Sequence, residues 1–244
     1  MNIILIFTFG ISLKDWQNTG LITRELKIYE SLNEKYGFTF TFITFGDQED
    51  VQIAKDIDFI NVIPSQTIVS FTKSRFLNFF KSLILPYKIK KYLKNADLIK
   101  TNQLSGSWIG IILKFMLKKP LLVRTGYDVL QFKINERKPK YIIVFYFILT
   151  QLCLIFSDIF SVTSIEDKLN MQKRFLGSEN ILINRNYVLH KYEKPFNERY
   201  QNKIIVVGRL EKQKNYIQLL ESLKGINCTI DIVGDGSERK KIEK

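Results

Sequence analysis

The sequence has only two cysteines, Cys153 and Cys228, and a single histidine, His190, among its 244 residues. Both cysteines lie in apolar stretches and match no metal-binding or redox spacing, so we expect buried free thiols in a reducing compartment. One histidine cannot form the cluster that holds a zinc ion. Repeats of solenoid length and low-complexity tracts are also lacking. These absences argue against a zinc protein, a disulfide framework and a solenoid.

Long hydrophobic runs are lacking as well. The uncharged run from Tyr141 to Ser157 falls short of the roughly 18 residues that indicate a membrane-spanning helix. A buried or membrane-grazing helix is expected there. The run from Met1 to Phe9 has no basic region before it and the length of a strand, so it predicts the first core strand rather than a signal peptide.

Acidic residues are few, and 37 Lys and Arg against 24 Asp and Glu give a formal net charge of +13. The lysines are spread out and accompany no nucleic-acid motif, so nucleic acid is not an expected partner. The stretch from Lys73 to Lys94 is basic, free of acidic residues and interleaved with aromatic and aliphatic side chains. Such a stretch predicts a basic amphipathic surface that docks on anionic lipid. The alternative is a solvated helix face over an apolar core.

The chain itself shows short apolar runs that alternate with segments of helical periodicity. This alternation predicts an α/β fold with a mostly parallel, doubly wound sheet. Ser164, followed by Asp167, predicts a helix start. We expect a first domain over 1–186, a linker over 187–202 and the start of a second domain over 203–244. The predicted strands of the first domain are Asn2–Phe7, Phe38–Ile43, Phe59–Ile63, Leu98–Lys100, Leu121–Arg124, Ile159–Val162 and Ile181–Ile183.

The carboxyl-terminal part places two cations where a strand gives way to a helix. Strands are predicted at Lys203–Val207 and Cys228–Val233, with a helix over Tyr216–Leu223 between them. In such a parallel βαβ unit, the loops at the carboxyl edge of the sheet bind ligands. Arg209 can fork onto two phosphate oxygens, and Lys214 supplies a point charge near the helix start. The alternative is that both are solvated surface cations.

The segment Gly208-Arg209-Leu210, with Lys214 five residues after the arginine, and the later segment Ile232-Val233-Gly234-Asp235-Gly236 with Arg239, resemble a known family. They are similar to the opening of the nucleotide-binding domain of retaining, family 4-like glycosyltransferases with the GT-B fold. The resemblance implies that Arg209 and Lys214 hold the diphosphate of a nucleotide sugar, with Gly234 and Gly236 in the same site. A dinucleotide fingerprint is excluded, because no third glycine follows Gly236 at the required spacing.

The same resemblance assigns roles to strand-end residues of the first domain. Gly20, after Asn18 and Thr19, resembles the glycine-bearing loop that approaches the donor phosphates, with a plain helix cap as the alternative. Asn102, Arg124 and Tyr127 resemble acceptor-side positions of polysaccharide-assembling members. Asp128 is the nearest ionisable group that can serve catalysis, with a turn residue as the alternative. Many relatives have a histidine where this chain has Gly126 and Tyr127.

A metal site is not expected. Asp56-Ile57-Asp58 has the spacing of metal-binding carboxylates in glycosyltransferases of the other major fold, but we interpret it as a turn before the strand at 59–63. Cationic side chains can neutralise a leaving diphosphate without a metal. The nucleotide sugar then enters as the donor substrate, and no cofactor is expected.

The sequence thus leads to the hypothesis of a GT-B-like glycosyltransferase that moves a sugar to a lipid-linked or polysaccharide acceptor, peripheral on the cytoplasmic face of the cell membrane. Family members place two glutamates eight positions apart in the second domain, and this sequence has no such pair. We therefore expect a second domain cut short, inactive as this chain, or completed by a second chain. The alternative is a catalytically silent, membrane-associated accessory subunit or fragment.

Overall fold

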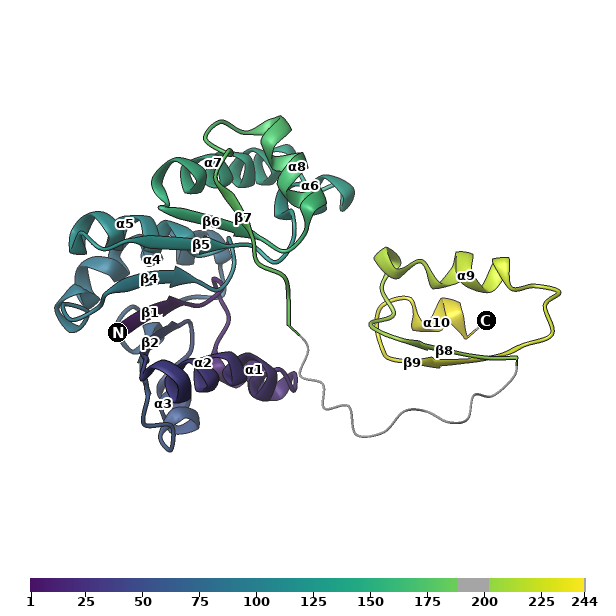
Figure 1. Ribbon diagram of the computed structural model, residues 1–244, viewed down its shortest axis with the longest axis horizontal. Coiled ribbons are helices and arrows are strands. Elements are labelled where there is room, and N and C mark those ends of the chain that lie inside the picture. The colour runs from purple at the N-terminus through teal and green to yellow at the C-terminus, as the bar shows by residue number, and fades with distance from the viewer. Residues whose placement is uncertain (188–201, 244) are drawn as a thin grey trace. The chain divides into compact units, whose positions relative to one another are not determined.

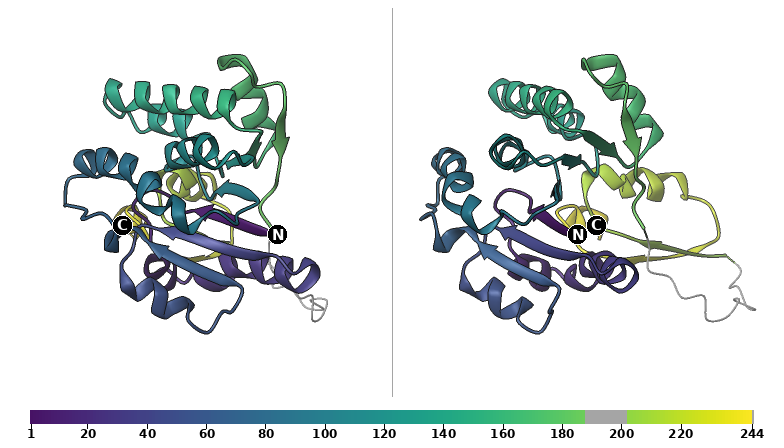
Figure 2. Two further views of the ribbon diagram at one scale, coloured as in Figure 1. Left: turned by 90° about the vertical axis from the view of Figure 1, so that its left-hand side faces the viewer. Right: turned by 60° about the vertical axis from the view of Figure 1, so that its left-hand side comes forward.

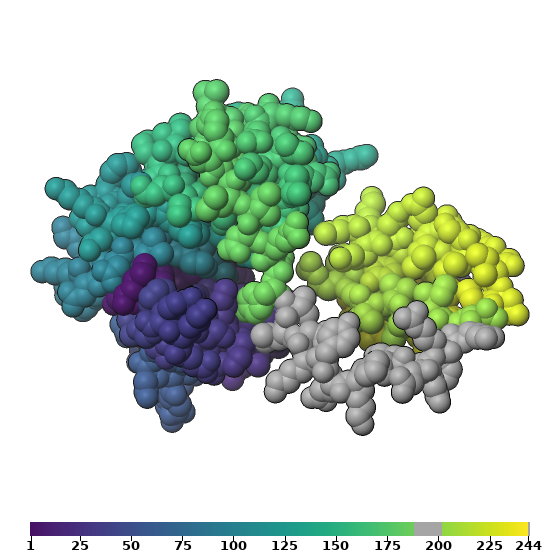
Figure 3. All heavy atoms as spheres, in the orientation of Figure 1, coloured from purple at the N-terminus to yellow at the C-terminus, as the bar shows by residue number. Residues whose placement is uncertain are grey.

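The computed structural model describes residues 1–187 and 202–243. The chain divides into two compact units, unit 1 from Met1 to Leu189 and unit 2 from His190 to Lys244. Unit 1 runs from purple to green in Figure 1, and unit 2 from light green to yellow. Figure 3 shows the heavy atoms of both units from the same side.

Unit 1 is built on a parallel seven-stranded sheet with the order β3-β2-β1-β4-β5-β6-β7. Its strands are short apolar runs, as expected for parallel strands. In the register, Leu5 lies beside Phe42 of one neighbouring strand and beside Lys100 of the other. All seven predicted strands are present to within one residue at each end, and the predicted doubly wound α/β fold is confirmed. The strands are β1 (Asn2–Ile6), β2 (Thr39–Thr44), β3 (Ile60–Pro64), β4 (Leu98–Thr101), β5 (Leu121–Arg124), β6 (Ile159–Val162) and β7 (Ile181–Ile183).

The helices of unit 1 begin at residues that can cap them. Ser12 and Asp15 form a capping box at the first helix, and Asp128 accepts a hydrogen bond from the backbone at the sixth. The helix start predicted at Ser164 is confirmed, because Ser164 Oγ accepts a hydrogen bond from Asp167 N at 3.0 Å. The helices are α1 (Leu13–Asn18), α2 (Ile22–Tyr36), α3 (Gln48–Ala54), α4 (Arg75–Ile89), α5 (Ser107–Leu117), α6 (Val129–Asn135), α7 (Lys140–Phe156) and α8 (Ile165–Arg174), with 3₁₀ turns η1 (Ser65–Thr67) and η2 (Lys90–Tyr92).

Helices pack against both faces of the sheet. On one face, the ring of Tyr29 in α2 lies with its centroid 5.0 Å from that of Phe40 and 5.2 Å from that of Phe42. On the other face, Gly110 lets α5 approach closely, because a Cβ there would stand 3.0 Å from Leu121 Cδ1. Figure 2 shows α5 and α7, in teal and green, across the sheet from the purple α1 and α2. The main hydrophobic core lies between these layers.

Unit 2 is a single βαβ unit followed by one more turn of helix. Its elements are β8 (Lys203–Val207), η3 (Lys212–Lys214), α9 (Tyr216–Ser222), β9 (Thr229–Val233) and α10 (Arg239–Ile242). The two strands are parallel, with Val206 beside Ile232, and the βαβ unit predicted from the sequence is confirmed. Half-buried and exposed residues alternate along β8, so one side of this strand is not covered.

The apolar run predicted as a buried or membrane-grazing helix forms α7. It buries Leu149, Cys153 and Leu154 and exposes a second apolar side that includes Tyr141 and Ile155. No helix within 1–187 or 202–243 is long and apolar enough to cross a membrane.

The prediction that both cysteines are buried is wrong for one of them. Cys153 is buried, and this burial raises the pKa of its thiol to about 12. Cys228 is only half-buried, because it precedes β9 in a unit with few elements to cover it. Both thiols are free.

Two further predictions concern loops. Asp56 and Asp58 lie exposed in the turn before β3, as predicted. The predicted linker lies outside the described residues, apart from Tyr187 and Asn202 at its ends.

Candidate functional site

The order of the strands across the sheet of unit 1 reverses between β1 and β4. From this point, β1 to β3 follow one another toward one edge of the sheet and β4 to β7 toward the other edge, while all the strands stay parallel. In open α/β sheets, ligands bind outside the carboxyl ends of the strands at such a switch point. Asn102 follows β4, and Arg124 ends β5, with Tyr127 just beyond it. The predicted acceptor-side residues therefore lie on the sheet edge where a ligand is expected.

Hydrogen bonds and a ring contact fix the positions of these predicted acceptor-side residues. Asn102 is buried, and its backbone N donates to Ile6 O at 2.8 Å. Arg124 Nη2 donates to Asn186 Oδ1 at 2.5 Å. Tyr127 is exposed, with its ring centroid 5.4 Å from that of Phe132. Asn102 is thus part of the packed strand end, whereas Arg124 and Tyr127 offer side chains at the surface.

Asp128 uses both of its carboxylate oxygens within unit 1. Oδ1 caps α6 by accepting from Gln131 N at 2.9 Å, and Oδ2 lies 3.2 Å from Arg174 Nη1. Arg174 Nη2 also donates to Gln131 Oε1 at 2.7 Å. The side chain of Asp128 is 7% exposed. These contacts favour the alternative that Asp128 is a turn residue over a role as a free acid or base. Its catalytic role stays a prediction.

Gly20 lies at the end of α1 and not within a cap of α2. Its φ of +67° is in the left-handed region, and its backbone N donates to Gln17 O at 3.0 Å. This is the conformation in which glycine commonly ends a helix. No side chain caps α2. The cap alternative therefore applies to the preceding helix, and the phosphate role of Gly20 stays a prediction.

A contact between a lysine and a tyrosine next to this edge was missed by the sequence reasoning. Lys100 Nζ lies 3.4 Å from Tyr29 Oη and 5.6 Å from the centroid of its ring. Burial, together with the nearby Arg124, lowers the pKa of Lys100 to about 8, while Glu25 opposes this shift. Burial also raises the pKa of Tyr29. A lysine within an apolar strand is the signal in the sequence that could have indicated this pair.

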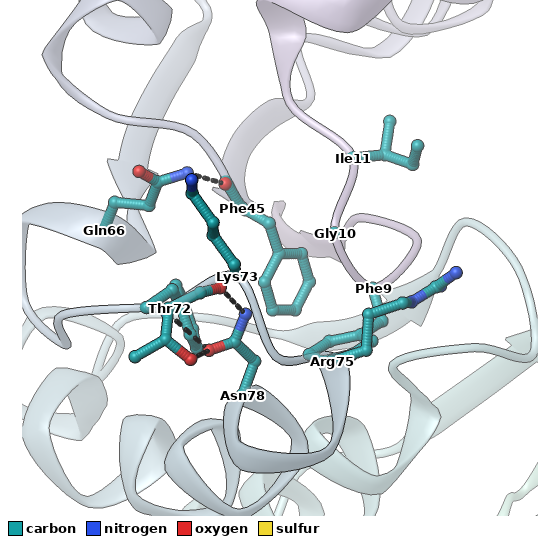
Figure 4. A pocket seen from close by; sticks show the side chains of 10 residues that line it. Phe9, Gly10, Ile11, Phe45, Gln66, Thr72, Lys73, Arg75 and Asn78 are labelled. Carbon is teal, nitrogen blue, oxygen red and sulfur yellow. Dashed lines mark hydrogen bonds between the residues drawn. The ribbon is translucent and has the colours of Figure 1, made fainter.

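A pocket of about 480 Å³ at the carboxyl ends of β1, β2 and β3 was also missed. Its walls come from the loops after these strands and from the segment that leads into α4 (Figure 4). Such a set of residues is brought together only by long-range folding, so no local signal indicates it. The lining residues are Phe9, Gly10, Ile11, Phe45, Gln66, Phe71, Thr72, Lys73, Arg75 and Asn78.

In unit 2, the predicted glycines bring two strand-end loops into contact. Gly234 has a φ of +154°, and any Cβ at this position would overlap Gly208 O. A Cβ on Gly236 would stand 2.7 Å from the carbonyl carbon of Leu210. Leu210 N also donates to Asp235 O at 2.9 Å. The structure thus gives both glycines a packing role, and contact with a donor stays a prediction.

Arg209 and Lys214 are exposed, one in the loop after β8 and the other at the end of η3. Within residues 1–187 and 202–243, neither forms an ion pair. A separate hollow of about 490 Å³ lies in the same unit, between Glu211, Tyr216 and Glu238, but Arg209 and Lys214 do not line it. Hydrogen bonds from Ser237 lower the pKa of Glu211. The two predicted donor-binding cations are thus available to an anion.

No group of His, Cys, Asp or Glu in the described parts of the chain has the arrangement of a metal site. The expectation of metal-free chemistry stays a prediction.

At the sequence level, no family model matches the chain. No curated protein matches it either. Solved structures do match in fold. They include the lipopolysaccharide outer core galactosyltransferase WaaB in its apo form, with 17% identity and a TM-score of 0.59 over 100% of this chain and 63% of that one.

Anabaena Alr3699/HepE in complex with UDP matches with 17% identity and a TM-score of 0.65, over 100% of this chain and 64% of that one. UDP-N-acetylglucosamine 2-epimerase from Rickettsia bellii matches with 11% identity and a TM-score of 0.50, over 100% and 64%. The chain spans less than two thirds of the length of these structures. At such identities the likeness concerns the fold, and one fold hosts several activities. The chain has a GT-B-like α/β fold, shared with glycosyltransferases.

Proposed function

We propose that this protein is a nucleotide-sugar-dependent glycosyltransferase whose donor is held by unit 2. The observation that carries the proposal is the pair Arg209 and Lys214, two exposed cations without ion pairs among the described residues, at the strand end of a GT-B-like fold. HepE, which shares the fold, has been solved with UDP and with UDP-glucose. The retaining, family 4-like assignment belongs to this proposal and rests on the resemblance of the motifs around Gly208 and Gly234.

In this proposal, catalysis is mainly electrostatic. Arg209 forks onto two oxygens of the donor diphosphate, and Lys214 adds a second positive charge as negative charge develops on the leaving group. No metal is needed. Gly20 of unit 1 approaches the donor phosphates, and Asn102, Arg124 and Tyr127 contribute on the acceptor side. Gly234 and Gly236 hold the loop that carries the site.

The acceptor is proposed to be a lipid-linked sugar or a surface polysaccharide, reached at the inner face of the cell membrane. The outer side of α4 supports this idea, because Phe76 is 70% and Tyr87 64% exposed within the basic stretch. Phe80 and Ile84 lie exposed on the same side of α4, and apolar side chains grouped in this way mark interaction surfaces. Apolar contact with charge attraction is the usual combination for docking on anionic lipid.

Binding of UDP to the purified protein tests the donor site. Arg209→Ala is expected to weaken binding by about 1.5–3 kcal/mol, the scale of a hydrogen bond to a charged group. Lys224→Ala removes another exposed cation of unit 2 and serves as the matched control. Calorimetry measures both affinities. An unchanged affinity in Arg209→Ala, or an equal loss in the control, would remove Arg209 from the site.

Sedimentation with vesicles tests the membrane part. The protein is expected to bind phosphatidylglycerol vesicles, to leave them as salt rises and to bind neutral vesicles poorly, because surface attraction is screened within about 10 Å at 0.1 M salt. Replacing Phe76 and Tyr87 by Ser is expected to reduce binding. Leu169→Ser, at an exposed position of α8, is the control. Equal binding to both kinds of vesicle would return α4 to an ordinary helix.

A silent accessory subunit is the second candidate. It is favoured by the contacts of Asp128, the candidate catalytic residue, because Gln131 N and Arg174 engage both of its carboxylate oxygens. Turnover of a nucleotide sugar by the purified chain would exclude this candidate. Binding of UDP without turnover would support it.

A further inference from the structure

The pocket at the ends of β1, β2 and β3 has a floor of aromatic rings. Phe45 is buried, and Phe9 and Phe71 are half-buried beside it. The ring centroids of Phe9 and Phe45 are 5.0 Å apart, and those of Phe45 and Phe71 are 5.9 Å apart. The three rings form a continuous apolar surface, against which the C–H face of a sugar or a lipid glycerol can pack.

Two cations stand at the rim of this aromatic floor. Figure 4 shows Lys73 ending beside Gln66 on one side of the Phe45 ring, with Arg75 on the other side next to Phe9. Neither cation forms an ion pair with any residue in 1–187 or 202–243. No carboxylate is among the described residues that line the pocket. The pocket is therefore positively charged and has room for an anion.

The wall that carries these cations is held in place by side chains of α4. Asn78 Oδ1 accepts from Thr72 N at 2.7 Å, and Asn78 Nδ2 donates to Thr72 O at 2.7 Å. Lys81 Nζ donates to Ser70 O at 2.6 Å. Lys88 Nζ donates to Ile68 O at 3.2 Å.

The basic residues of the stretch that precedes and forms α4 thus have different tasks. Lys81 and Lys88 bind loop carbonyls, whereas Lys73 and Arg75 line the pocket. A wall fixed by its own hydrogen bonds loses little conformational entropy when a ligand binds.

We propose that this pocket is a binding site for a phosphate ester. Lys73 and Arg75 bind the phosphate oxygens from two sides, and the Phe9, Phe45 and Phe71 rings carry the organic part of the ester. Arg75 presents a planar fork that suits two phosphate oxygens, and Lys73 a mobile point charge. The ester is either a glycosyl phosphate or the headgroup of a phospholipid. Only the assignment of this ester to the acceptor side rests on the proposed transferase function.

Binding of glucose 1-phosphate and of phosphatidylglycerol vesicles tests the proposal. The variant replaces Lys73 and Arg75 by Gln, and the matched control replaces Lys55 and Lys173 by Gln, which removes the same charge from exposed positions of unit 1 outside both the pocket and the basic stretch. Calorimetry follows the soluble ester, and sedimentation follows the vesicles. Circular dichroism checks that each variant is folded.

For a glycosyl phosphate, we expect saturable binding of glucose 1-phosphate that weakens by about tenfold or more in the pocket variant and is nearly unchanged in the control. For a lipid headgroup, glucose 1-phosphate does not bind, and vesicle binding falls in the pocket variant but not in the control. Equal losses in the two variants would mean diffuse attraction and would overturn the proposal. So would an absence of binding in both arms.

The donor site is tested separately in the same protein. UDP binding depends on Arg209 and is expected to be unchanged in the pocket variant. An absence of ester binding together with intact UDP binding would overturn this inference and leave the proposed function standing. The reverse result would leave a phosphate-ester site in a protein that is not a transferase.

Discussion

Unit 1 and unit 2 share the same local architecture but differ in how much of it is buried. The hydrophobic core of buried residues lies entirely in unit 1, where β1 has four consecutive buried residues and helices pack on both faces of the sheet. Among residues 202–243, the buried apolar side chains are Leu210 and Tyr216. Ile205 is 66% and Val207 71% exposed. Unit 2 thus has regularly paired strands but little buried apolar surface to stabilise them.

This difference has a consequence for stability. Burial of apolar surface is the main favourable contribution to folding, at about 25 cal/mol per Å². Unit 1 is expected to unfold as one cooperative body, because its core is continuous. In unit 2, local opening is expected at a much lower free energy.

The largest expected effect comes from removing a core ring of unit 1. Phe42 is fully buried and contacts Phe7 and Tyr29, so Phe42→Ala is expected to cost about 3–5 kcal/mol of unfolding free energy. Ile205→Ala in β8 is expected to cost less than about 0.5 kcal/mol, because the side chain is already largely in water.

Tryptophan fluorescence reports on unit 1 alone, because Trp16 and Trp108 both lie in it. Hydrogen exchange of the β8 and β9 amides reports on unit 2, where exchange is expected to be faster than in β1. Protection of β8 equal to that of β1 in a monomer would show that unit 2 is stable by itself and that burial is a poor guide here.

The sequence was sufficient for the strands but not for the sites. Periodicity and apolar runs located β1 to β9, because buried parallel strands need continuous apolar segments. Ser164 located a helix start for an equally local reason, the hydrogen bond to Asp167 N. Contacts between distant segments left no such trace. The ion pair of Arg174 with Asp128 spans 46 residues, so the sequence alone could not show that the carboxylate is occupied.

The same limit applies to the glycines and to the basic stretch. Gly234 was expected at a phosphate because of its motif, and the structure shows that it also lets its loop touch Gly208. Lys73 and Lys81 look alike in the sequence, yet one lines a pocket and the other holds a loop carbonyl. Charge and spacing predict a class of surface, whereas the task of each side chain depends on tertiary contacts.

The second prediction concerns Lys100, a buried lysine of unit 1 whose positive charge is destabilised by its burial. Lys100 has a pKa lowered to about 8, so its protonated form is disfavoured in the folded chain relative to the unfolded one. The unfolded chain then binds more protons between about pH 8 and pH 10.5, and stability rises with pH across this window. Below about pH 8 the lysine is protonated in both the folded and the unfolded chain, so burying its charge lowers the free energy of unfolding by the full amount. Lys100→Met is therefore expected to stabilise unit 1 at pH 7, by up to about 3.5 kcal/mol for a pKa lowered from 10.5 to about 8, at about 1.4 kcal/mol per pH unit.

Denaturant unfolding followed by tryptophan fluorescence at pH 7 and pH 9.5 measures this effect. The gain in Lys100→Met is expected to shrink at the higher pH. The measurements stay below about pH 10. Above that pH, tyrosine begins to ionise in the unfolded chain, and the raised pKa of Tyr29 in the folded chain would oppose the rise in stability. Lys55→Met, at an exposed position of unit 1, is the control and should show no such dependence. A destabilised Lys100→Met at pH 7 would mean that the Tyr29 contact outweighs the burial of charge.

The smallest expected effect compares one ion pair in each unit. Arg174 and Asp128 in unit 1 are 29% and 7% exposed, whereas Arg239 and Asp235 in unit 2 are 54% and 80% exposed. Exposed pairs contribute little, because water and salt screen them, and a partly buried pair that also accepts a backbone hydrogen bond contributes more. Arg174→Met is expected to cost about 1–2 kcal/mol in the unfolding of unit 1. Arg239→Met, which removes the exposed pairs with Asp235 and Glu243, is expected to leave the hydrogen exchange of unit 2 nearly unchanged.

Asp128→Asn sharpens this last comparison, since it removes the charge and keeps an oxygen that can cap α6. If Asp128 serves mainly as a cap and as the partner of Arg174, then Asp128→Asn and Arg174→Met should cost similar amounts, and the double variant should cost little more than either. Additive losses would show that the two residues act independently. In that case Arg174 does not occupy the carboxylate, and Asp128 regains its place as the candidate that acts on a sugar hydroxyl at the end of β5.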